Sequence, residues 1–384
     1  MKWRDCRLGD VLTLQRGHDL PADSRHEGDI PVVSSSGITG YHNEAKATAP
    51  GVVTGRYGTL GQVYYLEQDY WPLNTALYVV NFKGTHPRFA AYFLRNVLRD
   101  YQSDKAAVPG VDRNVLHEIK VRIPDQKSQE SIASTLSAYD ELMENNRRRM
   151  ALLEESARLL YREWFVHLRF PGHELSQFLN GLPERWRTVP LAEITTKIGS
   201  GSTPRGGEAS YLADGISLIR SLNVYDDRFQ DEGLAFISEA QAAALANVTV
   251  ESRDILLNIT GASVARCCMA PERYLPARVN QHVMIIRVDP HKADPFFVHA
   301  AINSDERKRQ LLSYAQKGST REALTKEMMA SFEITLASDA LTRQFGQIAE
   351  ASFCQREILA LQNQKLRSAR DLLLPRLMSG EIVA

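Results

Sequence analysis

The chain has 384 residues, which is enough for two or three domains of ordinary size with substantial cores. Its composition, 43% hydrophobic and 24% charged, is typical of a globular protein, and no apolar run approaches the length of a membrane span, so we expect a cytoplasmic protein without a membrane role. The 46 basic and 46 acidic side chains cancel, which argues mildly against a nucleic-acid partner but does not exclude one, because charge can cluster on one face.

The sequence contains two copies of one pattern. WRDCRLGDV starts at Trp3 and WRTVPLAEI at Trp186, an offset of 183 residues. Further matches follow in the same order, with offsets of 186 for DIPVVSSSG and GISLIRSLN, 203 for the segments that start at 51 and 254, and 206 for Asn74 and Asn280. Because the offset only rises, as insertions in loops would produce, we interpret the chain as a duplication.

Each copy is predicted to begin with a mixed part and to close with a long helix. In the first copy, β-rich runs at 52–57 and 76–82 precede a helical run at 89–101. In the second copy, 283–288 is β-rich and 296–315 is helical. We therefore expect an α+β fold: two pseudo-repeated mixed α/β domains separated by two long antiparallel coiled-coil helices. The expected bounds are 1–125 for the first domain, 126–175 for the first long helix, 176–337 for the second domain and 338–384 for the second long helix.

The long helices carry a heptad pattern. Apolar or small residues alternate four and three positions apart over 132–164, with Asn146 as the polar member. The range 348–373 repeats this spacing with Gln355 and Gln362 inside it. Polar residues in such a seam lower stability but fix register and partner. A helix of about 40 residues spans roughly 60 Å, a length that suits a strut.

Catalytic motifs are not found. The string closest to an adenine-methyltransferase motif, DPFF at Asp294, lacks the second proline, and the glycine turn after Gly58 lacks the Lys-Ser of a P-loop. The ten histidines have no metal-ligand spacing. We therefore expect no metal site and a binding protein in place of an enzyme. Two alternatives stay open: a protein-only scaffold, and a diverged stand-alone DNA methyltransferase or nuclease.

Polar loops recur at matching places in the two copies, at 34–43 and 220–228, at the glycine turn 55–58, and at 106–114 and 315–321. Arg can bind guanine, Asn can bind adenine, and Ser, Thr and Lys can bind phosphate. A duplex also suits a reader with twofold symmetry. We therefore predict contacts to double-stranded DNA from Ser35, Ser36, Tyr41, Asn43, Arg56, Tyr57, Arg113, Asn114, Arg205, Arg220, Asn223, Tyr225, Lys317, Ser319, Thr320 and Arg321.

At this point the sequence resembles a known family. The shared opening W-x-x-x-x-L-x-[DE]-[IV], the helix tails LLEESARLLYREWF and LRSARDLLLPRLMSGEI, and the stretch AQKGSTREAL are similar to specificity (S) subunits of type I restriction-modification systems. The resemblance covers nearly the whole chain. It implies that the two domains are target-recognition domains, each reading one half of a bipartite, asymmetric DNA site.

The resemblance also implies partners. The helices would set the spacer between half-sites and dock two methyltransferase (M) subunits, which bring S-adenosylmethionine and methylate adenine. Two restriction (R) subunits, with ATP and Mg, would join where such a subunit exists. The chain itself would be a non-catalytic subunit that binds no cofactor. Its partner-binding residues would be Met143, Asn146, Met150, Leu153, Leu160, Trp164, Leu359, Leu366 and Leu373.

Overall fold

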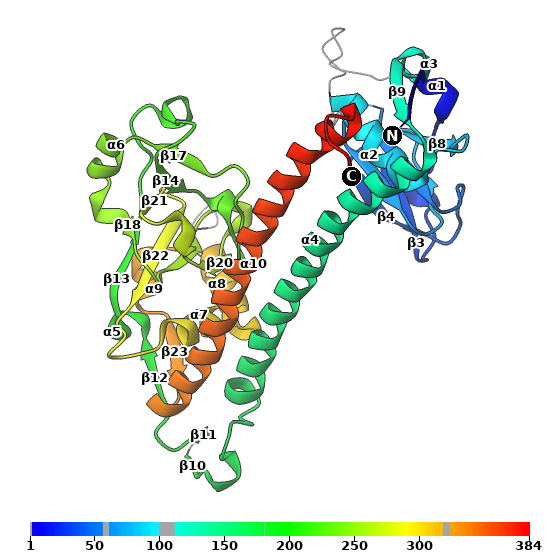
Figure 1. The fold of residues 1–384 in the computed structure, drawn as a ribbon. Helices are drawn as coiled ribbons and strands as arrows, with labels where there is room; N and C mark the ends of the chain where they lie inside the picture. Colours follow the sequence, from blue (N-terminus) through cyan, green and yellow to red (C-terminus); the bar gives the residue numbers. More distant parts are fainter. Residues whose placement is uncertain (1, 57–60, 100–111, 180, 318–322) are drawn as a thin grey trace. The chain divides into compact units, whose positions relative to one another are not determined.

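The computed structural model describes residues 2–56, 61–99, 112–179, 181–317 and 323–384 (Figure 1). The chain divides into two compact units. Unit 1 comprises Met1–Asn146 and Gln362–Ala384, and unit 2 comprises Arg147–Leu361. Each unit therefore contains one mixed domain and a part of each long helix. No described helix combines the length and the apolar character needed to cross a bilayer.

Two sheets form the mixed domain of unit 1. The first is antiparallel with strand order β2-β8-β5-β6, and its strands are Thr13–Arg16, Ala76–Asn81, Gly51–Gly55 and Val63–Leu66. The second has the order β4-β3-β7, with strands Gly37–His42, Ile30–Ser34 and Trp71–Pro72, and its β3 and β7 run parallel. Strands β1 (Trp3–Arg7) and β9 (Lys120–Pro124) pair separately. The helices of this domain are α1 (Leu8–Val11), α2 (Pro87–Arg99) and α3 (Arg113–Glu118).

Unit 2 repeats this plan. Its first sheet has the order β13-β22-β19-β20, with strands Thr195–Ser200, Val283–Val288, Ile255–Asn258 and Cys267–Met269. Its second sheet has the order β17-β14-β21-β18, with strands Ala235–Ile237, Ile216–Ile219, Ala277–Val279 and Thr249–Val250. The remaining pairs are β12 with β23 (Arg187–Pro190, Glu333–Leu336), β10 with β11 (Phe178–Leu179, Leu182–Pro183) and β15 with β16 (Val224–Tyr225, Arg228–Phe229). The short helices are α5 (Leu191–Ile194), α6 (Glu239–Ala244), α7 (Pro295–Asn303), α8 (Asp305–Lys317) and α9 (Lys326–Ala330).

The strand register confirms the duplication. The antiparallel partners Thr54 and Leu77 of unit 1 correspond to Leu257 and Met284 of unit 2. In the second sheets, β3 runs parallel to β7 as β14 runs parallel to β21. The largest jump in offset falls between β14 and β19, where unit 2 has β15, β16, α6 and β18 in addition to β17, which pairs with β14 as β4 pairs with β3.

The long helices are α4 (Gln126–Tyr161), which continues into a π-helical turn over Arg162–Val166, and α10 (Asp339–Ser379). They pair antiparallel in unit 1, since Asp140 bonds with Arg370 and Asn146 with Asn363 (3.0 Å). In unit 2, Arg356 forms an ion pair with Glu154 at 3.0 Å. The predicted fold class, two mixed domains with two antiparallel long helices, is confirmed.

Two details of the helices differ from the prediction. The expected single helix over 296–315 is broken at Ser304, whose backbone is extended and whose hydroxyl donates to Ala301 O at 2.8 Å, a local bond that competes with the helix. The predicted seam of the second long helix is wrong in register at two positions. Ile348 is 42% exposed and Gln362 is also exposed, whereas the neighbouring Asn363 faces Asn146.

Candidate nucleic-acid interface

The hairpin of β3 and β4 separates four of the predicted contact residues into two groups. Its turn consists of Ser35 and Ser36, and Ser36 is exposed while its N–H donates to Ser34 Oγ at 3.1 Å. Tyr41 and Asn43 lie at the other end of β4, five or more residues further along the chain. Tyr41 is 54% exposed, so its ring is free to stack on a base or a sugar.

The other predicted residues of unit 1 lie on two further elements. Arg56 directly follows β5, and its N–H donates to Thr75 O at 2.9 Å. Arg113 and Asn114 are exposed in the first turn of α3, where Asp112 caps the helix by accepting from Asn114 N at 2.8 Å. Tyr57 lies outside the described residues.

In unit 2, the side chains of two predicted residues are already engaged in hydrogen bonds within the domain. The guanidinium of Arg220 donates to Glu208 and to Gly233 O, both at 2.8 Å, and its side chain is only 17% exposed. Asn223 is fully buried, accepts from Arg220 N at 3.0 Å and donates to Gln230 O at 2.9 Å. A base contact by either side chain would require this loop to open, which argues for a structural role.

Tyr225 is better placed for a DNA contact than Arg220 and Asn223. The Arg228 guanidinium lies 5.2 Å from the centre of the Tyr225 ring, and that of Arg266 lies 4.6 Å from it. The turn of this β15–β16 hairpin is anchored because Lys308 donates to Asp226 at 2.5 Å. Two cations over one aromatic ring suit phosphate and base contacts. Neither arginine is among the predicted contact residues, although Arg228 lies in the predicted loop 220–228.

The remaining predicted residues of unit 2 are Arg205, Lys317, Ser319, Thr320 and Arg321. Arg205 is exposed and its carbonyl accepts from Gln241 at 3.4 Å. Lys317 is the last residue of α8. Ser319, Thr320 and Arg321 lie outside the described residues.

The predicted partner-binding residues are buried or half-buried by other parts of this chain. Met143, Asn146, Trp164 and Leu359 are buried, and Met150, Leu153, Leu160, Leu366 and Leu373 are half-buried. The exposed apolar side chains of the helices lie beside this seam, and they are Leu142, Leu152, Leu159, Ile348, Ile358, Leu361 and Leu372. Leu372 is 71% exposed and Leu152 is 67% exposed, so these residues are better placed to meet a partner. Except for Ile348, which belongs to the predicted seam, they could be found in the sequence as apolar residues outside the 4–3 spacing.

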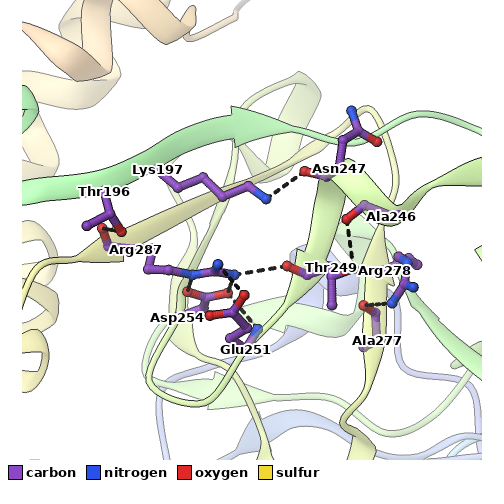
Figure 2. Close-up of polar contacts among 10 residues, drawn as sticks. All are labelled: Thr196, Lys197, Ala246, Asn247, Thr249, Glu251, Asp254, Ala277, Arg278 and Arg287. Carbon is purple, nitrogen blue, oxygen red and sulfur yellow. Dashed lines mark hydrogen bonds and ion pairs between the residues drawn. The ribbon is translucent and has the colours of Figure 1, made fainter. Parts of the chain in front are cut away.

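A buried ion pair braces the second domain (Figure 2). Arg287 on β22 forms two 2.8 Å bonds to Asp254, which is fully buried, and a third bond to Thr249 O at 3.0 Å. The hydrogen bonds to Asp254 raise the pKa of Arg287, so the guanidinium stays charged. Lys197 on β13 donates to Asn247 O at 2.6 Å, and burial lowers the pKa of its ammonium group. This network joins the two sheets of the domain.

Two groups of described side chains bear on catalysis, the metal-ligating residue types and the cysteines. Among them, no three His, Cys, Asp or Glu side chains come together as a metal site. Cys267 and Cys268 are buried free thiols, and burial raises the pKa of each. A buried, protonated thiol is a poor nucleophile.

Comparison with known proteins gives concordant matches. Residues 1–155 match the family described as "Type I restriction modification DNA specificity domain". The specificity subunit of the type I restriction enzyme MjaIX from Methanocaldococcus jannaschii is 24% identical over 306 residues, 76% of this chain and 67% of that protein. The HindI specificity subunit from Haemophilus influenzae is 19% identical over 340 residues, 73% of each chain.

A solved structure shares the fold. The crystal structure of the S subunit of a type I restriction-modification system from M. genitalium superimposes with a TM-score of 0.64 at 14% sequence identity. The match covers 98% of this chain and 96% of that one. The likeness therefore includes both mixed domains and both long helices.

Proposed function

We propose that this chain, which belongs to the specificity subunits of type I restriction-modification systems, reads a split DNA site, one half with each domain. The observation that carries the proposal is the duplication. Two domains share strand order and register but present different loop side chains at equivalent places. Reading a split, asymmetric site requires two domains with the same backbone fold and different contact side chains.

The long helices would set the distance between the half-sites. Both α4 and α10 run from unit 1 into unit 2, with the boundary after Asn146 in one and after Leu361 in the other. Inserting a few residues after Asn146 should therefore lengthen the unspecific spacer and leave both half-sites unchanged. An unaltered spacer would contradict this role of the helices.

Partner subunits would supply the chemistry. We propose that two M subunits dock on the exposed apolar side chains of the helices, including Leu152 and Leu372, and bring S-adenosylmethionine. Where an R subunit exists, it would join this assembly with ATP and Mg. The buried thiols and the missing motifs support a non-catalytic role for the chain, acting on DNA in the cytoplasm.

Sequencing of methylated bases in host DNA, with and without this gene, tests the proposal. A split adenine-methylated motif that disappears with the gene is the expected result. The purified chain alone should bind DNA with an affinity that falls steeply with salt and should methylate or cut nothing. Salt-independent binding would favour the protein-only scaffold, and modification by the chain alone would favour the stand-alone enzyme.

A further inference from the structure

Each domain has a backbone corner of the same kind, with a glycine directly after the first strand of its first sheet. A Cβ atom on Gly17, directly after β2, would lie 2.2 Å from Leu73 O, and one on Gly201, directly after β13, would lie 1.7 Å from Val279 O. Gly17 N donates to Ala76 O at 3.0 Å, and Gly201 N donates to Asn280 O at 3.1 Å. No other residue allows backbones to approach so closely. Each corner therefore brings the end of one strand onto the turn that links the two sheets.

In the second domain, this corner holds a chain of polar side chains. The Thr203 hydroxyl donates to Gln281 Oε1, and Gln281 Nε2 donates to His282 Nε2 at 3.0 Å. His282 Nδ1 in turn lies 2.6 Å from Thr260 Oγ1. With the His282 proton on Nδ1, His282 Nε2 accepts from Gln281 and Nδ1–H donates to Thr260 Oγ1. The Gln281 amide is exposed and yet held in one orientation.

The amide of Gln281 keeps half of its hydrogen-bonding capacity. An amide has two N–H donors and two acceptor lone pairs, and the contacts above use one of each. One N–H and one lone pair remain, and a glutamine amide uses one of each to bind N7 and the N6 amino group of adenine in the major groove. The contact therefore needs no reordering of the side chain, which reduces the entropy lost on binding.

The surroundings of the corner match a DNA contact. Ala323 forms a β-bridge with Thr260, and Leu324 N donates to Ile259 O at 2.8 Å. In the sequence, the predicted DNA-contact residues Lys317, Ser319, Thr320 and Arg321 come shortly before Ala323 and Leu324, which are anchored at this corner. In the first domain, the equivalent turn places Asn74 against the exposed Asp19, to which its amide donates. The two corners are alike in backbone and different in hydrogen-bonding pattern.

We propose that Gln281 is a specificity-determining residue that reads one adenine in the half-site of the second domain, with Thr203 and His282 as positioning residues. The proposal rests on the proposed function, because it names one of the contacts by which that function would be carried out.

Methylome sequencing of a strain that carries only the Gln281→Ala variant tests the proposal. One position of one half-site should become degenerate, with discrimination reduced about five- to 150-fold, while the spacer and the other half-site stay unchanged. Gln281→Glu should shift the preference at that position toward cytosine, because a carboxylate accepts from the cytosine amino group. His282→Ala and Thr203→Val should weaken discrimination at the same position. Gln177→Ala, at another exposed glutamine of unit 2, is the matched control and should change nothing.

The outcomes separate this proposal from the proposed function. If wild type yields no split motif, the proposed function fails. If wild type yields one and Gln281→Ala leaves it intact, only the role of Gln281 is overturned. If the variant abolishes modification, the role of Gln281 is tested by competition binding. The assembled complex is offered duplexes that carry each base pair at each position of the site. Lost discrimination at one position then supports the proposal, and a uniform loss of affinity overturns it.

Discussion

The buried ion pair of the second domain makes a quantitative prediction about stability. Asp254→Ala removes the partner of Arg287 from a site where the carboxylate is fully buried and the guanidinium side chain is 21% exposed. Breaking a buried pair on one side costs about 3–5 kcal/mol, because the remaining charge stays buried without compensation. Arg287 still reaches the exposed Glu251 and Thr249 O, so we expect the lower end, about 3 kcal/mol.

Denaturant unfolding of the full chain, followed by hydrogen exchange of the amides of β19 and β22, measures this loss in unit 2. The matched control is Glu193→Ala, which breaks the exposed pair with Arg187 and should cost less than about 1 kcal/mol. Replacing Asp254 and Arg287 together by leucine should recover most of the loss, because no buried charge remains. The reasoning is refuted if Asp254→Ala and Glu193→Ala destabilise the chain equally.

Three further predictions concern the long helices. Asn146→Leu leaves Asn363 Oδ1 without its donor and should destabilise the chain by about 1–2 kcal/mol in urea unfolding. Leucine at both positions should restore stability, and a double variant less stable than both single variants would contradict this. Asp125 caps α4, and its bonds to the N–H groups of Lys2 and Ser128 lower its pKa to about 2, below the value in the unfolded chain. The stability that this carboxylate contributes is therefore present above about pH 4 and is lost as the pH falls toward 2. The melting-temperature difference between wild type and Asp125→Asn should therefore shrink over that window, and a constant difference would count against the cap. Leu152→Glu should reduce the amount of M subunit seen with the chain by native mass spectrometry without lowering its melting temperature, and an intact complex would exclude Leu152 from the docking surface.

The duplication could be predicted because sequence offsets record insertions directly. With the offset of 203 for Thr54 and Leu257, their strand partners Leu77 and Met284 are 207 residues apart, one more than the offset of 206 found for Asn74 and Asn280. The order of the matched segments therefore agrees with the strand register, and the last of these offsets is wrong by one residue. The register of the seam in the second long helix is harder to predict from the sequence. Gln362 and Asn363 are adjacent amides, and a 4–3 spacing fits either of them. Only the position of Asn146 on the other helix decides between them.

The contact residues were the least predictable part, because residue type does not reveal whether a side chain is already engaged. Arg220 has the chemistry to bind guanine, yet Glu208 and Gly233, more than ten residues away along the chain, occupy its guanidinium. Gln281 gives the opposite case. It has no identical counterpart in the first copy, where the turn carries Asn74 and Thr75, so comparison of the copies passes over it. Its role depends on neighbours that only the fold brings together.

The strand pairs that close each domain also bear on how such a protein can change. In β1 and β9, Trp3 lies opposite Pro124 and Arg7 opposite Lys120, so the chain enters and leaves the first mixed domain about 4.8 Å apart. Pairing of β12 with β23 does the same for the second domain. The two junctions of each domain are therefore adjacent, and we expect that a foreign domain whose first and last strands can pair could replace it, whatever its internal length. If each domain reads one half-site as proposed, such an exchange would change one half of the recognition sequence in one step and leave the long helices unaltered.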